Sequence, residues 1–285
     1  MRNIFYKLKK SGKNIVMKVI KHVSMGRRVS QPLWEWLHKL SLEGMNIGSG
    51  SNVRDSGELW VIDYLGRYSS KNRQAIIFDV GANIGSYSSA VISRLGKTVR
   101  LYCFEPSKKA FELLTSNLTE YENVNCFNFG FGDKEEFVTL YSNAEGSGLA
   151  SIYNRRLDHF GISMKQTEQI CIRTLNNFCR DNEIEYINLL KLDVEGHELK
   201  VLNGAHNLID SNSIDFIQFE FGGCNIDSRT YFQDFFYLLN PYCKIYRVLK
   251  DGIAPIEHYK ETYEIFLTTN YLAISRKICD PGNKC

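Results

Sequence analysis

The sequence lacks the cysteine patterns that bind structural metals. Its eight cysteines contain no C-x-x-C pair and no Cys/His cluster at zinc spacing, so we expect no structural metal site. Three of them, Cys103, Cys126 and Cys171, lie in apolar runs typical of buried strands, where a free thiol is a small hydrophobic group. This usage suits a reducing compartment, and we therefore expect a cytoplasmic protein.

The chain also lacks an apolar run of about 20 residues, so we expect no membrane-spanning helix. Its N-terminal segment has no signal-peptide core, because Lys18 interrupts the apolar stretch 15–20 and Lys21 ends it. No acid precedes Glu35, whereas nine cations do. This basic amphipathic stretch indicates either that residues 1–28 contact an anionic membrane peripherally or that they pack on the rest of the protein.

The charge of the whole chain is nearly balanced. With 35 basic and 32 acidic residues, the net charge of +3 is too small to indicate a nucleic-acid partner. A hydrophobic fraction of 44% and a charged fraction of 24% are ordinary for a globular protein. We expect two parts, a basic helical extension over residues 1–57, ending in a Gly- and Ser-rich loop, and a catalytic domain over residues 58–285.

From residue 58 onward, short β-rich runs alternate with segments of helical periodicity. This pattern predicts an α/β fold with a doubly wound and mostly parallel sheet. We expect strands at 75–80, 99–105, 123–130, 187–194, 214–221 and 243–249. The pattern of residues 135–156 predicts an inserted hairpin or flap. The pattern of residues 263–275 predicts a hairpin partner or final strand. Ligands bind at the carboxyl ends of strands in such sheets.

The first strand end carries a candidate cofactor loop. Gly81 and Gly85 allow a sharp turn and a close backbone approach, and Asp79 adds a carboxylate. Glu105 ends the next strand, where a carboxylate can accept hydrogen bonds from the ribose hydroxyls of an adenosine. The loop lacks the G-x-G-x-x-G spacing of dinucleotide sites. Because S-adenosylmethionine carries a sulfonium and an ammonium that favour carboxylates, it fits this loop better than NAD.

A second strand end places several titratable groups close together. Lys191, Asp193, Glu195 and His197 lie within the segment LLKLDVEGHE. A helix start with acids in its first turn would explain Glu195. It would not explain Lys191 and Asp193, which share one face of an otherwise apolar strand, where a charge is costly unless it is paired or functional. We therefore predict that this segment is catalytic.

These motifs resemble the FkbM-type methyltransferases. The resemblance covers most of residues 58–275 and rests on FDVGANIGSYS (78–88), FEP (104–106), IRTLNNF (172–178), LLKLDVEGHELKVLNGA (189–205), FEF (219–221) and TNYLAI (269–274). The resemblance implies the Rossmann-like fold of class I methyltransferases and an O-methyltransferase that acts on sugars, glycolipids or polyketide-type compounds. One departure is Asn176, where the family usually has an aspartate.

The resemblance implies roles for the first strand ends. The loop from Asp79 through Gly81, Ala82 and Asn83 to Gly85 would hold the methionine end of the cofactor. Glu105 would hold its ribose. Asp133, which follows the third strand, is a candidate for the adenine edge, and its alternative reading is a turn residue before a hairpin.

The remaining acids suggest how the reaction is catalysed. A methyl transfer to oxygen needs a group that accepts the hydroxyl proton, and Asp193, Glu195 and His197 are the candidates, with the carboxylates ranked first. We also predict that Asp193 contacts the cofactor. Lys191 would either hold Asp193 in place or contact the acceptor. Glu220 would bind acceptor hydroxyls. We weighed a divalent cation shared with Asp193 and expect none, because further oxygen ligands are missing.

The sequence therefore predicts an S-adenosylmethionine-dependent O-methyltransferase that acts on a hydroxyl of a sugar, glycan or related polyhydroxy acceptor. The first alternative is methylation of a lipid or polyketide-type hydroxyl. An NAD-dependent oxidoreductase and a non-catalytic binding module are alternatives from other classes. An amine methyltransferase is disfavoured because no Asn/Asp-Pro-Pro-aromatic motif follows the fourth strand. The sequence leaves the oligomeric state open.

Overall fold

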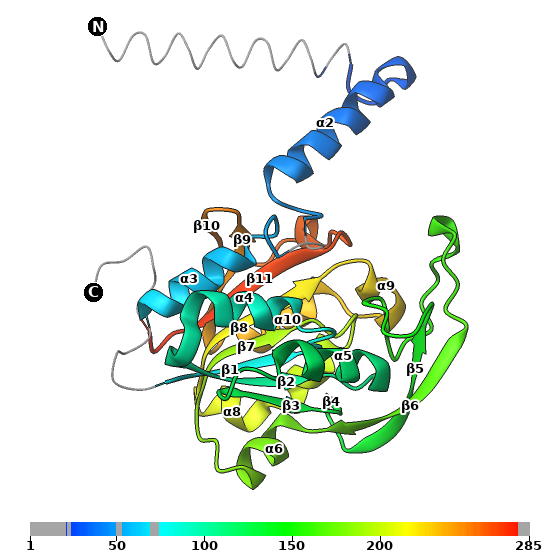
Figure 1. The fold of residues 1–285 in the computed structure, drawn as a ribbon. Coiled ribbons are helices and arrows are strands. Elements are labelled where there is room, and N and C mark those ends of the chain that lie inside the picture. Colours follow the sequence, from blue (N-terminus) through cyan, green and yellow to red (C-terminus); the bar gives the residue numbers. More distant parts are fainter. Residues whose placement is uncertain (1–20, 22–23, 50–52, 69–73, 279–285) are drawn as a thin grey trace, which may run out of the picture. The chain divides into compact units, whose positions relative to one another are not determined.

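A mostly parallel sheet organises the chain (Figure 1). The computed structural model describes residues 21, 24–49, 53–68 and 74–278. Within them, eight strands pair in the order β10-β9-β11-β8-β7-β1-β2-β3. Strands β1, β2, β3, β7, β8 and β9 run in one direction, and β10 and β11 run in the opposite direction. The strands are β1 (Ala75–Val80), β2 (Val99–Phe104), β3 (Val124–Phe127), β7 (Ile187–Leu192), β8 (Ile214–Phe221), β9 (Cys243–Leu249), β10 (Gly252–Ile256) and β11 (Thr269–Ser275).

Helices cover both faces of this sheet, which confirms the predicted doubly wound fold (Figure 1). Successive residues of a strand point to opposite faces, so the fully buried Ile77 and Phe78 of β1 belong to two separate cores. On the face of Ile77 pack α3 (Glu58–Tyr68), α4 (Ser86–Leu95) and α5 (Lys108–Leu118). On the face of Phe78 pack α6 (Leu175–Asp181), α7 (Glu198–Asn203), α8 (His206–Asp210) and α10 (Phe232–Leu239).

A second, smaller sheet has the strand order β4-β6-β5 and differs from the predicted hairpin. Its strands are β4 (Gly130–Phe131), β5 (Glu136–Ser142) and β6 (Gln166–Arg173). The predicted return strand within residues 135–156 contributes only an isolated bridge between Tyr141 and Ser151. Strand β5 pairs instead with β6, because β6 offers seven consecutive partners, from Ile172 to Gln166. Residues 143–165 therefore form a long loop between the two strands.

The antiparallel end of the main sheet also refines the prediction. The segment 263–275 supplies the expected final strand, β11, which lies between β8 and β9. Strand β10 was not predicted, and its antiparallel pairing with β9 extends the sheet beyond that point. Strands β10 and β11 lie towards the end of the strand order opposite β3. They therefore leave unchanged the order of β7, β1 and β2, at whose carboxyl ends ligands are expected.

The chain divides into two compact units, which are described separately. The first, up to Met45, contains a short 3-10 helix, Arg28–Ser30, and α2 (Gln31–Gly44), which confirms the helical character expected there. Most of residues 1–28, for which a membrane contact was predicted, lie outside the described residues. The described helices include none with the length and apolar character needed to cross a membrane. The second unit begins at Asn46, whose Nδ2 donates to the carbonyls of Ser56 and Val248.

Candidate active site

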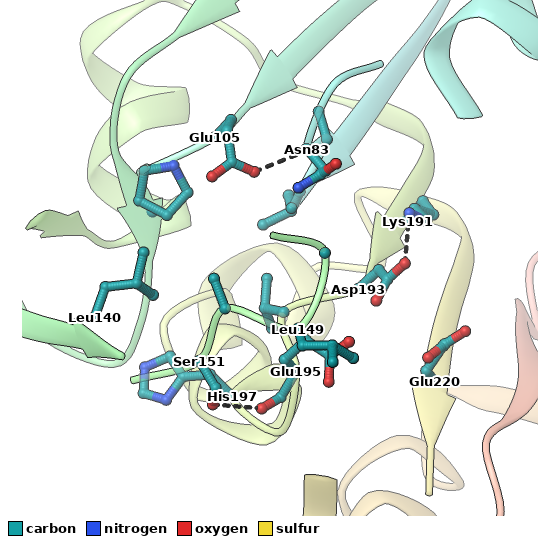
Figure 2. A pocket seen from close by; sticks show the side chains of 18 of the residues that line it. Asn83, Glu105, Leu140, Leu149, Ser151, Lys191, Asp193, Glu195, His197 and Glu220 are labelled. Carbon is teal, nitrogen blue, oxygen red and sulfur yellow. Dashed lines mark hydrogen bonds and ion pairs between the residues drawn. The ribbon is translucent and has the colours of Figure 1, made fainter. Parts of the chain in front are cut away.

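A cavity of about 470 Å³ lies in the second unit, at the carboxyl ends of β1, β2, β7 and β8 (Figure 2). Most residues predicted for the site line it: Gly81, Ala82, Asn83, Glu105, Lys191, Asp193, Glu195, His197 and Glu220. Figure 2 shows Lys191, Asp193 and Glu220 on one side, away from Leu140 and His197. Asp79, Gly85 and Asp133 lie outside the lining. The cavity therefore has two chemically different ends.

The turn after β1 is clamped between its two neighbouring strands. Gly81 has φ +81°, and a Cβ placed on it would lie 1.8 Å from the carbonyl oxygen of Asp193, so only glycine fits. The Asp193 amide in turn donates to the carbonyl of Val80 over 3.0 Å. Gly85 has φ +89° and faces Leu114 of α5, so its role is to start α4 rather than to line the cavity. This packing brings the end of β7 against the candidate cofactor loop.

Glu105 joins the ends of β1 and β2. Its Oε2 accepts a hydrogen bond from the Asn83 amide, and its Oε1 accepts one from the Ser107 amide, both over 2.8 Å. Burial raises the pKa of Glu105 to about 7, against the lowering effect of the two amides. A carboxylate offers about four lone-pair sites, so each oxygen can accept a further hydrogen bond from a ligand hydroxyl.

Lys191 forms ion pairs with two aspartates at the wall of the cavity. Its Nζ lies 3.4 Å from Oδ1 of Asp79 and 3.2 Å from Oδ2 of Asp193. Asp79 is fully buried and also accepts a hydrogen bond from the Ser88 hydroxyl over 2.6 Å. Burial lowers the pKa of Lys191, but the charges of Asp193 and Asp79 outweigh it and hold that pKa well above the usual value. Asp79 thus contacts Lys191 behind the cavity wall, whereas Asp193 lies at the wall itself.

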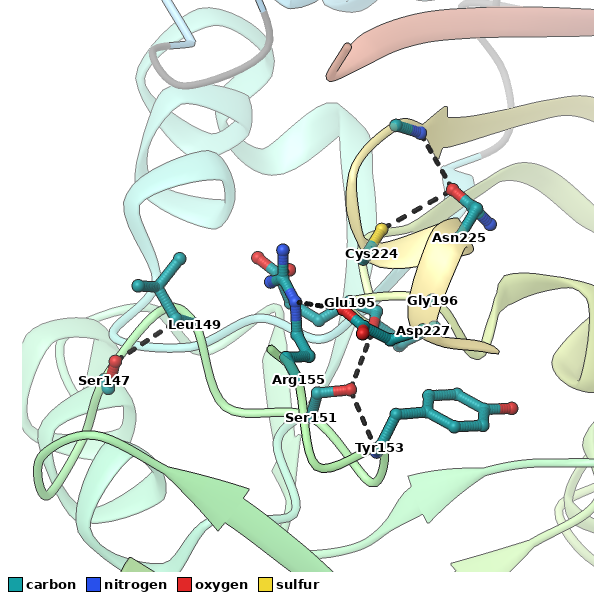
Figure 3. Close-up of polar contacts among 12 residues, drawn as sticks. Ser147, Leu149, Ser151, Tyr153, Arg155, Glu195, Gly196, Cys224, Asn225 and Asp227 are labelled. Carbon is teal, nitrogen blue, oxygen red and sulfur yellow. Dashed lines mark hydrogen bonds and ion pairs between the residues drawn. The ribbon is translucent and has the colours of Figure 1, made fainter. Parts of the chain in front are cut away.

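The other polar residues of the segment point in different directions. Glu195 adopts φ 51° and forms an ion pair with Arg155, while its carbonyl accepts a hydrogen bond from the Ser151 hydroxyl (Figure 3). Burial and the charge of Asp193 raise the pKa of Glu195, and Arg155 opposes both. Glu198 is fully buried and accepts hydrogen bonds from the amides of Val194 and Gly196. Glu195 and Glu198 are therefore engaged by protein groups, and Asp193 is the carboxylate of this segment that best faces a ligand.

His197 belongs to the other end of the cavity. Its Nδ1 lies 3.1 Å from the Tyr153 hydroxyl, and its Nε2 lies against Gly132. Burial lowers the pKa of His197 to about 4, so its imidazole is neutral at physiological pH. A neutral imidazole can accept a proton, but the view in Figure 2 separates it from Asp193 and Glu220.

We expect the buried imidazole to make stability pH-dependent. The folded pKa of about 4 lies below the unfolded value of about 6.5, so the stabilisation is complete above pH 6.5 and is lost as the pH falls towards 4. Urea unfolding of wild type and His197→Gln between pH 7.5 and 4.5 should show a steeper loss for wild type. Parallel pH dependences would contradict a depressed pKa at His197.

Two charged residues at the site, Glu58 and Arg155, were not predicted. Glu58, the first residue of α3, lines the cavity and is 5% exposed. Arg155 lies in the loop 143–165 and also approaches Asp227, with its Nε 3.7 Å from Oδ2. An acid in a first helical turn and an arginine in a loop are common on protein surfaces, so neither residue carries a local signal.

Two residues singled out from the sequence lie away from the cavity. Asp133 pairs with Lys200 over 2.6 Å at a partly exposed position outside the cavity lining. Asn176, the departure from the family pattern, lies in the first turn of α6, and its Nδ2 is 3.1 Å from Nδ1 of His206. That departure therefore does not touch the cavity. In the described parts of the chain, no three His, Cys, Asp or Glu residues are grouped to hold a metal ion.

Strand order and site together define the class of protein. A parallel sheet with an antiparallel strand inserted next to its last parallel strand, and a cavity over the turn after β1, is the Rossmann-like fold of class I methyltransferases. The family described as "Methyltransferase FkbM domain" matches residues 79–242, more than half of the chain. The chain belongs to this FkbM methyltransferase family.

Curated relatives and solved structures are more distant. The hexuronic acid methyltransferase AglP of Haloferax volcanii is 26% identical over 150 residues, covering 52% of this chain and 56% of AglP. The 2-O-methyltransferase NoeI of Sinorhizobium fredii is 22% identical over 153 residues, covering 50% and 63%. The chain thus spans less than two thirds of the length of these relatives. A crystal structure of the methyltransferase FkbM from Methylobacillus flagellatus superposes with a TM-score of 0.44 at 17% identity, covering 71% of this chain and 44% of that one.

Proposed function

We propose that this chain is an S-adenosylmethionine-dependent O-methyltransferase that acts on a hydroxyl of a sugar, glycan or related polyhydroxy acceptor. The observation that carries the proposal is the division of the cavity. Glu105 and the turn after β1 form one end, and Lys191, Asp193 and Glu220 form the other. A methyl donor and a hydroxyl acceptor need such neighbouring sites, because the transfer is in line.

The residues of the first end fit the cofactor. Glu105 holds the loop at Asn83 with one lone pair of Oε2 and keeps others for ribose hydroxyls. Beside it, Pro106, Phe131, Leu140 and Ile172 form an apolar wall suited to a planar adenine. Asp193 belongs to the second end, but it adjoins the turn after β1, because its carbonyl oxygen lies against Gly81. Its negative charge would therefore also face the ammonium and sulfonium of the cofactor. Asp79 supports this arrangement indirectly, through Lys191.

The residues of the second end would handle the acceptor hydroxyl. The bound cofactor supplies an electrophilic methyl group that needs no further activation. Asp193 accepts the hydroxyl proton, and Lys191 fixes its carboxylate by the contact of 3.2 Å to Oδ2. Glu220 is 9% exposed, and no hydrogen bond joins it to another of the described side chains. Its carboxylate is therefore available to bind the acceptor.

Polyhydroxy acceptors are favoured by the number of carboxylates at this end, since hydroxyl groups donate hydrogen bonds to them. The names of AglP and NoeI, a hexuronic acid methyltransferase and a 2-O-methyltransferase, support the same class. A lipid or polyketide-type hydroxyl is the second candidate, favoured by the apolar residues Leu149 and Ile152 in the lining.

Replacement of Glu105 tests the cofactor end. Glu105→Ala should weaken S-adenosylhomocysteine binding by about 1.5 to 3 kcal/mol, the scale of a hydrogen bond to a charged group. Isothermal titration of the folded variant measures this change, with Glu112→Gln on the exposed side of α5 as the control. Unchanged affinity in a folded Glu105→Ala protein would remove Glu105 from the cofactor site.

Titration of wild-type protein separates the methyltransferase from an oxidoreductase. We expect saturable binding of S-adenosylhomocysteine and none of NAD, because the turn after β1 lacks the glycine spacing of dinucleotide sites. Binding of NAD alone would contradict the proposal.

A further inference from the structure

The acceptor end of the cavity is built partly from residues outside the family match. Val53, Glu58 and Thr268 line the cavity and lie before or after the matched residues 79–242. Thr268 packs against Gly222, just beyond β8, so it lies near Glu220. Val53 is close to Glu58, since its carbonyl lies 3.4 Å from the hydroxyl of Ser56. The cofactor end, in contrast, takes its polar residues from inside the match.

Glu58 is held in one orientation by buried neighbours. Its Oε1 accepts a hydrogen bond from Gln218 Nε2 over 3.0 Å, and its Oε2 accepts one from the Ser56 hydroxyl over 2.9 Å. Gln218 is itself fully buried and also donates to Oδ1 of Asn270 over 3.2 Å. A carboxylate fixed at both oxygens is pre-organised for a ligand, and its unused lone pairs can still accept hydrogen bonds.

Glu58 and Glu220 belong to the same end of the cavity. Gln218, which holds Glu58, and Glu220 are two residues apart on β8 and therefore share one face of the sheet. Asn270, the cross-strand partner of Glu220, contacts Gln218 and leaves its buried Nδ2 without a protein partner. Burial raises the pKa of Glu220 most, followed by the charges of Asp193, Glu195 and Glu58, and the contribution of Glu58 agrees with this proximity.

Resting on the proposed function, we propose that Glu58 is a specificity-determining residue that recognises an acceptor hydroxyl. Together with Glu220 it selects acceptors that carry neighbouring hydroxyls, of which one is methylated and the other is bound. Two carboxylates at one end of a cavity provide the acceptor atoms that a diol requires, and the rigid Gln218 contact sets their spacing. A monohydroxy acceptor would lack the hydrogen bond to Glu58 and would therefore bind more weakly.

The substitution Glu58→Gln tests this role with little disturbance of the fold. The Gln218 amide can keep its bond to the remaining carbonyl oxygen. The Ser56 hydroxyl can accept from the new amide and donate its proton to the Val53 carbonyl. Glu220→Gln is the second variant, since its side chain has no hydrogen bond to another described side chain. Glu112→Gln, on the exposed side of α5, is the matched control.

The experiment compares a hydroxylated methyl glycoside that wild type methylates with its monodeoxy analogues. For Glu58→Gln we expect the KM of the parent to rise about tenfold, with kcat nearly unchanged. One deoxy analogue should show no such rise, because the hydroxyl that contacts Glu58 is missing. Titration of the parent into protein saturated with S-adenosylhomocysteine should show the same loss, and cofactor affinity should match wild type.

Three outcomes would overturn the inference. An unchanged KM in Glu58→Gln would exclude contact between Glu58 and the acceptor, whatever the KM of Glu220→Gln. An equal rise for the parent and every deoxy analogue would indicate a general distortion. A fall in kcat at constant KM would indicate that Glu58 affects the transfer step and not the binding of the acceptor. Failure of the proposed function is a distinct result, because wild type would then transfer no methyl group to any hydroxylated acceptor.

Discussion

Asp193→Asn should lower turnover about a hundredfold or more, the range for loss of a positioned general base, while the protein stays folded. The substitution keeps the shape and the amide contact to Val80, and it removes the charge that Lys191 holds. Initial rates with labelled S-adenosylmethionine, measured at saturating acceptor, provide the test. Asp133→Asn is the matched control, because Asp133 forms a partly exposed pair with Lys200 outside the cavity lining.

The cofactor affinity of Asp193→Asn distinguishes its two possible roles. If turnover falls and S-adenosylhomocysteine binds as in wild type, Asp193 acts on the acceptor proton. If both fall together, Asp193 orients the methionine end, and Glu220 becomes the better base. Near-normal turnover in Asp193→Asn, with Glu220→Gln also active, would contradict the assignment of this strand end as the catalytic centre.

Lys191→Met should destabilise the fold by about 3 to 5 kcal/mol, the cost of leaving a buried charge without its partner. Asp79 is fully buried, and Lys191, whose side chain is 5% exposed, is its cationic partner. Chemical denaturation monitored by circular dichroism measures the change. The charge-neutral double variant Asp79→Asn with Lys191→Met should recover part of the loss, because no uncompensated buried charge remains.

The exposed pair of Lys200 and Asp133 is the natural comparison for that variant. Its side chains are 48% and 31% exposed, so solvent screens the attraction. Lys200→Met should therefore change the stability by less than about 1 kcal/mol. Equal effects of Lys191→Met and Lys200→Met would contradict the structural importance of the buried network.

The parallel strands of the fold could be predicted because their signal is local. Residues 75–80 and 214–221 are short, apolar and rich in β-branched and aromatic residues, and glycine or a polar turn follows each. The pairing of β5 with β6 could not be predicted in the same way. It joins residues separated by the long loop 143–165, and strand pairing over such a distance depends on tertiary contacts.

The site could be predicted as a set of strand ends but not in its orientations. The spacing of Lys191 and Asp193 indicated a shared face, and their direct contact agrees with it. Beyond Asp193 the periodicity no longer applies, because Glu195 has φ 51° and Gly196 has φ 103°. These two residues turn the chain, so Glu195 meets Arg155 and His197 meets Tyr153. Because Arg155 and Tyr153 come from a distant loop, the local sequence around Glu195 and His197 could not predict these contacts.

Methyl transfer to an acceptor hydroxyl can be observed directly in the product. The protein is incubated with S-adenosylmethionine carrying a ¹³C-labelled methyl group and with a panel of nucleotide sugars, oligosaccharides and glycolipids, and the products are analysed by two-dimensional NMR. We expect a labelled methyl signal correlated with an oxygen-bearing ring carbon of a sugar, and its loss in Asp193→Asn. A label found only on nitrogen or carbon, or on a hydroxyl of a lipid or polyketide and on no sugar, would contradict this account.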